Sequence, residues 1–202
     1  VGTKYTSVVE FNKYCMTILF LPIDIEIPKI DISKIQSTIN VINGLTYIKT
    51  AQHQQYWDTS RITETVDDTL KSVLDQLPIN KVTNVYYKEQ RQAVAPHCDV
   101  YANMKFEEGE YANILDNEPA GYRLVLEGST DVLYVKSGDT FKLAELPKVP
   151  CLYIINSTAG LHMVKDDPGR KIIYIRGLID KARHQTLIEK SLNRYKNLSI
   201  IS

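Results

Sequence analysis

His97 and Asp99 flank a single residue in the segment Ala95-Pro96-His97-Cys98-Asp99. In an extended chain, residues two apart point to the same side, so both side chains can reach one point. His162 lies much later, at the edge of another predicted strand, and can supply a third ligand. Two histidines and one carboxylate leave three positions open on an octahedral iron ion, which suits a metal that binds a cosubstrate and O2 together. The sequence therefore predicts a metal site formed by His97, Asp99 and His162.

A basic residue follows the second histidine at a useful distance. Arg170 comes after His162 across the turn Asp167-Pro168-Gly169, so it can stay near the metal. A guanidinium is a planar, two-pronged donor that matches a carboxylate. Arg176 shares the face of Arg170 but lies about 20 Å further along an extended strand, and Lys171 would face the other side. Arg170 is therefore the candidate for holding the free carboxylate of a metal-bound cosubstrate.

Three parts of the chain resemble the aspartyl/asparaginyl β-hydroxylase branch of the Fe(II)/2-oxoglutarate dioxygenases, which also includes free-proline hydroxylases. The resemblance runs from about Lys81 to Asp180, roughly half of the chain. It rests on Ala95-Pro96-His97-Cys98-Asp99, on Gly121-Tyr122-Arg123-Leu124-Val125-Leu126, and on Leu161-His162-Met163-Val164 followed by Gly169-Arg170-Lys171-Ile172. The sequence departs from the branch at Val125, where the family has a histidine, and in a shorter loop between the last two motifs.

The resemblance implies a hydroxylase that uses Fe(II), 2-oxoglutarate and O2, and that releases succinate and CO2. Its substrate would be an amino acid or a peptidyl side chain. Arg170 would bind the distal carboxylate of 2-oxoglutarate. Arg123 would point into the barrel, where it either binds a substrate carboxylate or forms a salt bridge at the barrel mouth. Tyr87, shortly before the first histidine, either donates a phenol hydrogen bond to the cosubstrate or lines the barrel.

Two other functions remain open at this point. A cupin-like metalloenzyme that does not use 2-oxoglutarate would share the three metal ligands, and replacing Arg170 would then matter little. A non-catalytic jelly-roll binding module would carry His97 and His162 incidentally and would bind no iron. The sequence contains no P-loop, no GxSxG motif and no HExxH helix, so it gives no support to a kinase, a serine hydrolase or a zincin.

The elements that must position these residues are mainly strands. Short β-rich runs separated by turn residues predict an all-β sandwich or barrel, and they cover 82–88, 122–127, 132–135, 140–143, 151–156 and 171–179. Alternation predicts a further strand over Ile23–Ile27. Apolar residues at helical spacing predict helices over 32–42, 66–77 and 187–195. Together with the resemblance, this predicts a mainly β fold with flanking helices and a double-stranded β-helix (jelly-roll, cupin-like) core.

We expect a single domain over 1–202, with a strand and helical segment over 1–80, the core over 81–180 and a closing helix over 181–202. Lys plus Arg number 24 and Asp plus Glu number 24, so no nucleic-acid footprint is evident. The cysteines form no CxxC pair, which favours a reducing, cytoplasmic location over a disulfide framework or a zinc ribbon. The first apolar run is too short to span a membrane. We expect a small-molecule or peptide substrate, and the closing helix offers a surface for a homodimer.

Overall fold

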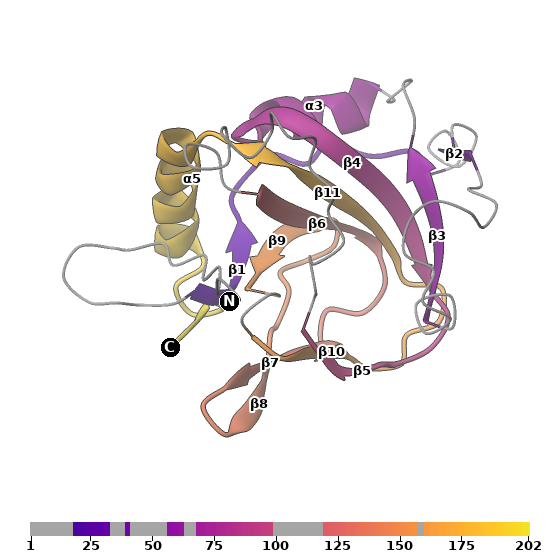
Figure 1. The fold of residues 1–202 in the computed structure, drawn as a ribbon, viewed down its shortest axis with the longest axis vertical. Helices are drawn as coiled ribbons and strands as arrows, with labels where there is room; N and C mark the ends of the chain where they lie inside the picture. Colours follow the sequence, from indigo (N-terminus) through magenta and orange to yellow (C-terminus); the bar gives the residue numbers. More distant parts are fainter. Residues whose placement is uncertain (1–17, 33–38, 41–55, 63–67, 99–118, 157–159) are drawn as a thin grey trace, which may run out of the picture.

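The fold is described by a computed structural model for residues 18–32, 39–40, 56–62, 68–98, 119–156 and 160–202. In these residues the architecture is mainly β, with antiparallel pairing throughout two sheets (Figure 1). None of the described helices is long and apolar enough to cross a membrane.

The larger sheet, called sheet A, has eight strands in the order β12-β1-β9-β6-β11-β4-β3-β2. Its strands are β1 (Ile18–Ile23), β2 (Ile39–Asn40), β3 (Trp57–Ile62), β4 (Ile79–Gln90), β6 (Pro119–Glu127), β9 (Cys151–Ile155), β11 (Lys171–Ile179) and β12 (Ile200–Ile201). The smaller sheet, called sheet B, has the order β5-β10-β7-β8. Its strands are β5 (Val94–His97), β7 (Leu133–Ser137), β8 (Thr140–Leu143) and β10 (His162–Val164).

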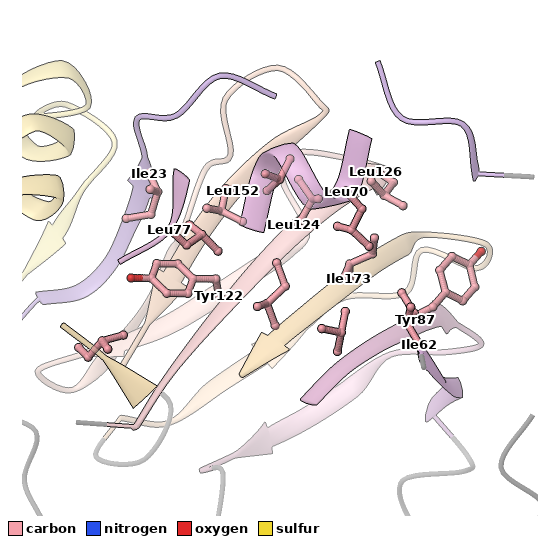
Figure 2. Packing of buried hydrophobic residues seen from close by; sticks show 14 of the residues in the cluster. Ile23, Ile62, Leu70, Leu77, Tyr87, Tyr122, Leu124, Leu126, Leu152 and Ile173 are labelled. Atoms are coloured by element: carbon pink, nitrogen blue, oxygen red, sulfur yellow. The ribbon is translucent and has the colours of Figure 1, made fainter. Parts of the chain in front are cut away.

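The outer face of sheet A is apolar and carries the helices. Register across four strands sets Tyr87, Ile173, Leu124 and Leu152 in one row. All four belong to a buried cluster that also contains Leu70 and Val73 of α3 (Asp68–Gln76) and Ile188 of α5 (Lys181–Arg194). Figure 2 shows this packing around Leu124, Leu152 and Ile173. Burial of these side chains stabilises the fold and fixes the orientation of every residue between them.

The inner face of sheet A points toward sheet B. The row next to the outer one contains Lys88, Ile172, Val125 and Cys151, which must point the opposite way because side chains alternate along a strand. The last three share a second buried cluster with residues of sheet B, including Leu133, Val135 and Val164. Figure 1 shows β5, β7 and β10 on the side of sheet A away from α3.

Helix α5 is fixed at both ends by polar contacts. Asp180 is its N-cap and accepts a hydrogen bond from the backbone N–H of Arg183 at 3.0 Å. Near its end, Arg194 forms an ion pair with Asp24, which is only 7% exposed. The backbone N–H of Asp24 also donates to Ser191 Oγ at 2.9 Å. These contacts hold α5 against the segment that follows β1.

Most of the predicted strands are confirmed, as are the helices predicted over 66–77 and 187–195. The closing helix expected over 181–202 ends at Arg194, and Ile200–Ile201 form β12, which pairs with β1. The predicted strand over Ile23–Ile27 is wrong, because β1 begins at Ile18 and ends at Ile23. The backbone N–H of Asp24 bonds to α5 and that of Ile25 bonds to Ile23 O, so neither is available for a strand ladder. The predicted helix over 32–42 is wrong at Ile39–Asn40, which form β2 paired with Ile62 and Arg61. The other residues of that helix lie largely outside the described ones.

Candidate metal centre

His97 and His162 lie side by side on neighbouring strands of sheet B. They are direct partners in the antiparallel pair β5–β10, and such partners project to the same face. Their ring centroids are 4.2 Å apart with an interplanar angle of 48°. His162 is buried and His97 is half-buried. Two imidazoles at this separation can share one metal ion.

The hydrogen bonding of His97 selects the nitrogen that can bind a metal. Its Nδ1 lies 2.8 Å from the carbonyl oxygen of Ala95. A carbonyl oxygen only accepts, so Nδ1 carries the hydrogen and the lone pair of the neutral ring is on Nε2. A backbone carbonyl in this role is a common means of orienting a metal-binding histidine. The carbonyl of Ala95 in β5 therefore prepares Nε2 of His97 as a ligand.

Asp99, the third predicted ligand, lies outside the described residues. Among the residues that the structure does describe, no group of three or more His, Cys, Asp or Glu side chains gathers in a way that could hold a metal. The structure thus brings two of the three predicted ligands together, and the carboxylate stays a prediction.

Arg170 is the most deeply buried charged residue of the site, at 1% exposure. Its backbone is held firmly: the N–H donates to Asp167 O at 3.0 Å, and the carbonyl accepts from Gln90 N at 2.9 Å. None of its three guanidinium nitrogens has a hydrogen-bond partner in the described part of the chain. A buried charge without a counter-ion is costly, so this geometry calls for an anion.

Like its neighbour Arg170, Gln90 has a buried side chain with a polar atom that lacks a hydrogen-bond partner among the described residues. Its side chain is 2% exposed, and its Nε2 donates to Lys165 O at 2.7 Å and to Gln92 O at 3.1 Å. Its Oε1 is buried without a partner among the described residues. Buried acceptors and donors left open next to one another are typical of a site that a polar ligand or ordered water completes.

Gly128 makes room for the Arg170 side chain. A Cβ atom on Gly128 would lie 2.5 Å from Cγ of Arg170, and the φ of Gly128 is +119°, a conformation that L side chains rarely adopt. The turn at Gly128 is in turn tied to the β10–β11 loop, because the Ser129 N–H donates to Asp167 Oδ2 at 2.8 Å. Two glycine- and aspartate-containing turns, both visible in the sequence, therefore combine to place one guanidinium.

Cys151 lies near Arg170 but is not a nucleophile. Burial raises the pKa of the Cys151 thiol to about 12, even though the positive charge of Arg170 acts in the opposite direction. The side chain therefore stays a neutral thiol at neutral pH. It contributes to the wall of the site as a small apolar group.

Arg123 points to the inner face, as the resemblance implies. It is 8% exposed and is paired across the sheet with Tyr174 on β11 and Tyr153 on β9. Its guanidinium carbon lies 4.7 Å from the centroid of the Tyr174 ring. Val125, two residues on, is fully buried among apolar side chains of the inner cluster. The position where the branch that the sequence resembles has a histidine is thus part of the core here.

The prediction for Tyr87 needs correction. Tyr87 pairs with Ile173 on the outer face, is 5% exposed within the apolar cluster, and its hydroxyl lies 3.4 Å from Glu89 Oε2. Since neighbouring residues of a strand point to opposite faces, it is Lys88 that faces sheet B from this strand. Tyr87 is therefore not part of the candidate site. Lys88 and Tyr174 lie on the face of sheet A that points toward sheet B, and counting back in steps of two from Arg176 on β11 would have placed Tyr174 on that face.

A surface pocket of about 430 Å³ lies elsewhere, between α3, β4 and the start of α5. Its lining includes Leu74, Val82 and Arg183, which belong to the helix-covered side of sheet A. It is separate from the histidine pair.

No protein-family model matches the chain, and no curated protein matches it significantly.

Proposed function

We propose that the chain is an Fe(II)- and 2-oxoglutarate-dependent dioxygenase that hydroxylates an amino acid or a peptidyl side chain. The observation that carries this proposal is the buried guanidinium of Arg170, which has no hydrogen-bond partner in the described residues and lies one short loop after a histidine that faces a second histidine. A histidine pair alone would fit many metal sites. The buried guanidinium of Arg170 narrows the choice, because it requires an anion at a defined position.

In this proposal His97, His162 and Asp99 hold the metal. Bound Fe(II) supplies the one-electron and O2 chemistry that no amino-acid side chain can perform. The task of the chain is to present imidazole nitrogens in the right orientation, which the Ala95 carbonyl does for His97. His162 is buried, so its side of the centre is shielded from solvent.

Arg170 binds the distal carboxylate of 2-oxoglutarate. A fork-shaped guanidinium donates two parallel hydrogen bonds to a carboxylate, and burial makes the interaction stronger than in water. Because the arginine backbone is held by Asp167 and Gln90, the cosubstrate is oriented at its far end. This arrangement discriminates 2-oxoglutarate from pyruvate, which has the same 2-oxo acid group but no second carboxylate to bind.

The overall reaction conserves atoms: substrate C–H, 2-oxoglutarate and O2 give substrate C–OH, succinate and CO2. The inner face of sheet A and the facing strands of sheet B are compatible with the double-stranded β-helix that this reaction class uses. The sequence resemblance supports the same function from the motifs around His97, Arg123 and Arg170.

The test is an anaerobic titration of the full-length chain with Fe(II) and 2-oxoglutarate. We expect a weak visible charge-transfer band at about 500 nm, produced by the bidentate chelate. His162→Ala should abolish the band, and Asp99→Asn should weaken Fe(II) binding. Arg170→Gln should raise the Kd for 2-oxoglutarate about 100-fold, because a charged hydrogen-bond pair is broken. Pyruvate should bind about as weakly to the unsubstituted protein as 2-oxoglutarate does to that variant.

Arg91→Gln is the matched control. It removes the same charge from an exposed surface pair with Asp58, which should not affect the cosubstrate. Iron binding without the band, and without any effect of Arg170→Gln, would favour the cupin-like metalloenzyme. If the chain does not bind iron, the result would favour the non-catalytic binding module.

A further inference from the structure

Gln90 and Arg170 face each other across a β-bulge just before β11. The Gln90 N–H donates to Arg170 O, and the Gly169 N–H donates to Gln90 O, both at 2.9 Å. Two residues thus oppose one, and Gly169 takes the positive φ, +87°, that this type of bulge requires. Partners across an antiparallel pair project to the same face. The side chains of Gln90 and Arg170 therefore project together from the inner face of sheet A.

The amide of Gln90 can take only one orientation. One of its ends lies 2.7 Å from Lys165 O and 3.1 Å from Gln92 O. Both partners are carbonyl oxygens, which only accept, so this end is the NH2 group and both of its hydrogens are used. The other end, Oε1, is thereby fixed as an acceptor in the interior, where it has no hydrogen-bond partner among the described residues.

The described part of the chain also leaves the guanidinium of Arg170 without an anion. Asp167 is the acidic residue that precedes Arg170 most closely in the sequence, but its carboxylate is bonded to Ser129. Oδ2 accepts from the Ser129 N–H at 2.8 Å, and Oδ1 accepts from the Ser129 hydroxyl at 3.3 Å. Arg170 and Gln90 are only 1% and 2% exposed, so bulk water does not solvate their polar atoms. A bound ligand has to do so.

A carboxylate alone does not complete this pair of side chains. It neutralises the guanidinium of Arg170 through two parallel hydrogen bonds. It carries no hydrogen, however, so it cannot donate to Oε1 of Gln90, and a buried acceptor without a donor costs free energy. The best complement is therefore an anion that presents two oxygens to the guanidinium and one hydroxyl group to the amide.

We infer that Arg170 and Gln90 together bind an oxyanion that carries its own O–H group, and that this ion is hydrogen carbonate. Hydrogen carbonate is planar and singly charged. Two of its oxygens match the guanidinium fork, and its O–H can donate to Oε1 of Gln90. The 2-oxoglutarate carboxylate requires an added water molecule to reach the same oxygen.

This inference rests on the proposed function, because it names a regulator of the cosubstrate position. Hydrogen carbonate and the distal carboxylate of 2-oxoglutarate would use the same guanidinium of Arg170, so each excludes the other. The proposed reaction releases CO2, which reacts with water to give hydrogen carbonate and a proton. Accumulated product would therefore reduce cosubstrate binding, and Gln90 is the residue that makes the site sensitive to it.

The main probes are hydrogen carbonate and acetate, a planar carboxylate of the same charge in which a methyl group replaces the hydroxyl. Each is added as its sodium salt to the full metal-free chain, at equal concentration and slightly alkaline pH. Urea unfolding measures binding, because a ligand of the folded state raises its stability. We expect the Kd for hydrogen carbonate to be about tenfold lower, owing to one hydrogen bond to a buried acceptor. Equal effects of the two anions would overturn the inference without any variant.

Hydrogen phosphate is the third probe, at matched ionic strength, because it also carries an O–H but is tetrahedral. We expect it to bind more weakly than hydrogen carbonate, since the guanidinium of Arg170 and the carboxylate that it binds in the proposed function are both planar. Tighter binding of hydrogen phosphate would overturn the choice of a planar ion.

Substitutions then locate the preference. Arg170→Gln should remove the effect of both anions. Gln90→Met keeps a similar volume but removes the acceptor, so acetate should still bind and the preference for hydrogen carbonate should disappear. Gln76→Met is the matched control, because the exposed Gln76 amide is bonded at both ends: Oε1 accepts from the Glu26 N–H at 2.9 Å, and Nε2 donates to Glu26 O at 2.7 Å.

A preference that survives Gln90→Met in folded protein would show that Oε1 is not the reader of the hydroxyl, and the inference would be wrong. If Gln90→Met does not fold, the comparison of Arg170→Gln with the unsubstituted chain decides the question. A preference for hydrogen carbonate that persists in Arg170→Gln would place the anion elsewhere and overturn the inference.

The two proposals fail separately, since the anion measurements need neither iron nor 2-oxoglutarate. If the chain binds neither Fe(II) nor 2-oxoglutarate but prefers hydrogen carbonate to acetate, the oxygenase function is wrong and the anion site of Arg170 and Gln90 stands. If the chain gives the visible band with Fe(II) and 2-oxoglutarate but shows no preference between the anions, the oxygenase function stands and the hydrogen carbonate site is wrong.

Discussion

The two faces of sheet A use the same strands for opposite purposes. On the outer face, the row Tyr87, Ile173, Leu124 and Leu152 is apolar and fully covered. On the inner face, the adjacent rows combine apolar residues with Arg123, Arg176 and Lys88, and Arg170 precedes them. The outer face contributes stability, whereas the inner face holds charges that fold formation alone would not select.

This contrast follows from the two-residue period of a strand. Consecutive residues of β11, such as Ile173 and Tyr174, lie on faces with different solvation and different neighbours. A substitution in the apolar outer row should therefore change chiefly the free energy of unfolding, and one at a charged position of the inner face should change ligand affinity. The position of a residue along the strand predicts which of these measurements responds.

The largest expected effect is on the outer face. Ile173→Ala removes a fully buried side chain from the centre of the apolar cluster. We expect the free energy of unfolding to fall by about 3 kcal/mol, from lost transfer energy and the cavity that remains. Urea unfolding monitored by circular dichroism measures this loss. The Kd for 2-oxoglutarate in the folded fraction should stay within about twofold, and a large change there would break the division between the faces.

A substitution of Arg170 on the inner face should instead raise the free energy of unfolding. Arg170→Met replaces a buried, unneutralised guanidinium with an apolar side chain of similar length, and such replacements are commonly neutral or stabilising. We expect the metal-free protein to gain up to about 2 kcal/mol in unfolding free energy while binding of 2-oxoglutarate is lost. Urea unfolding of both proteins without ligand gives the comparison. A loss of stability would show that the guanidinium is neutralised within the chain itself.

Short β-rich runs bounded by turn residues made most of the strands predictable from the sequence. They placed the runs that became β4, β6, β9 and β11, and the Asp167-Pro168-Gly169 turn that leads to Arg170. The pattern does not reveal which alternate face is covered by helices. Tyr87 was therefore assigned to the wrong face, because an aromatic residue suits either side. The error disappears once the register of Tyr87 with Ile173 is known.

Predictions from local periodicity were also wrong where the backbone forms hydrogen bonds with a segment that is distant in the sequence. Asp24 alternates as a strand residue would, yet its N–H bonds to Ser191 and its carboxylate pairs with Arg194 on α5. Ile39 has helical spacing to its neighbours and pairs with Ile62 instead. The pairing of His97 with His162 is equally non-local. The sequence could suggest it only through residue chemistry and resemblance, since nothing near either residue encodes the other.

A hydrogen bond between Tyr122 and His184 at the outer cluster gives the stability of the protein a pH dependence. His184 of α5 lies 2.7 Å from the Tyr122 hydroxyl through Nδ1, and burial lowers the pKa of His184 from 6.5 to about 4. The unfolded chain therefore binds a proton between these values more readily than the folded one. The stability contribution is present above pH 6.5 and is lost as the pH falls toward 4.

Between pH 7 and pH 5 this group should cost about 2 kcal/mol of unfolding free energy. Urea unfolding at several pH values measures the slope. His184→Asn removes the titrating group and should flatten the curve in this window, whatever its effect at pH 7. An unchanged slope in that variant would assign the acid sensitivity to other residues.

The smallest expected effect is at the Gly128 turn, where one substitution should change both the free energy of unfolding and the affinity for 2-oxoglutarate. Gly128→Ala must adopt a φ of +119° and would place Cβ 2.5 Å from Cγ of Arg170. We expect a loss of about 1 kcal/mol in unfolding free energy from backbone strain, and a several-fold rise in the Kd for 2-oxoglutarate because the guanidinium is displaced.

Gly138→Ala is the matched control, since Gly138 also has a positive φ, +61°, but nothing lies within 4 Å of its added Cβ. It should lose similar stability with no change in cosubstrate affinity, measured by the same anaerobic titration. If both variants weaken 2-oxoglutarate binding equally, general loosening of the fold explains the effect, and Gly128 has no special part in positioning Arg170.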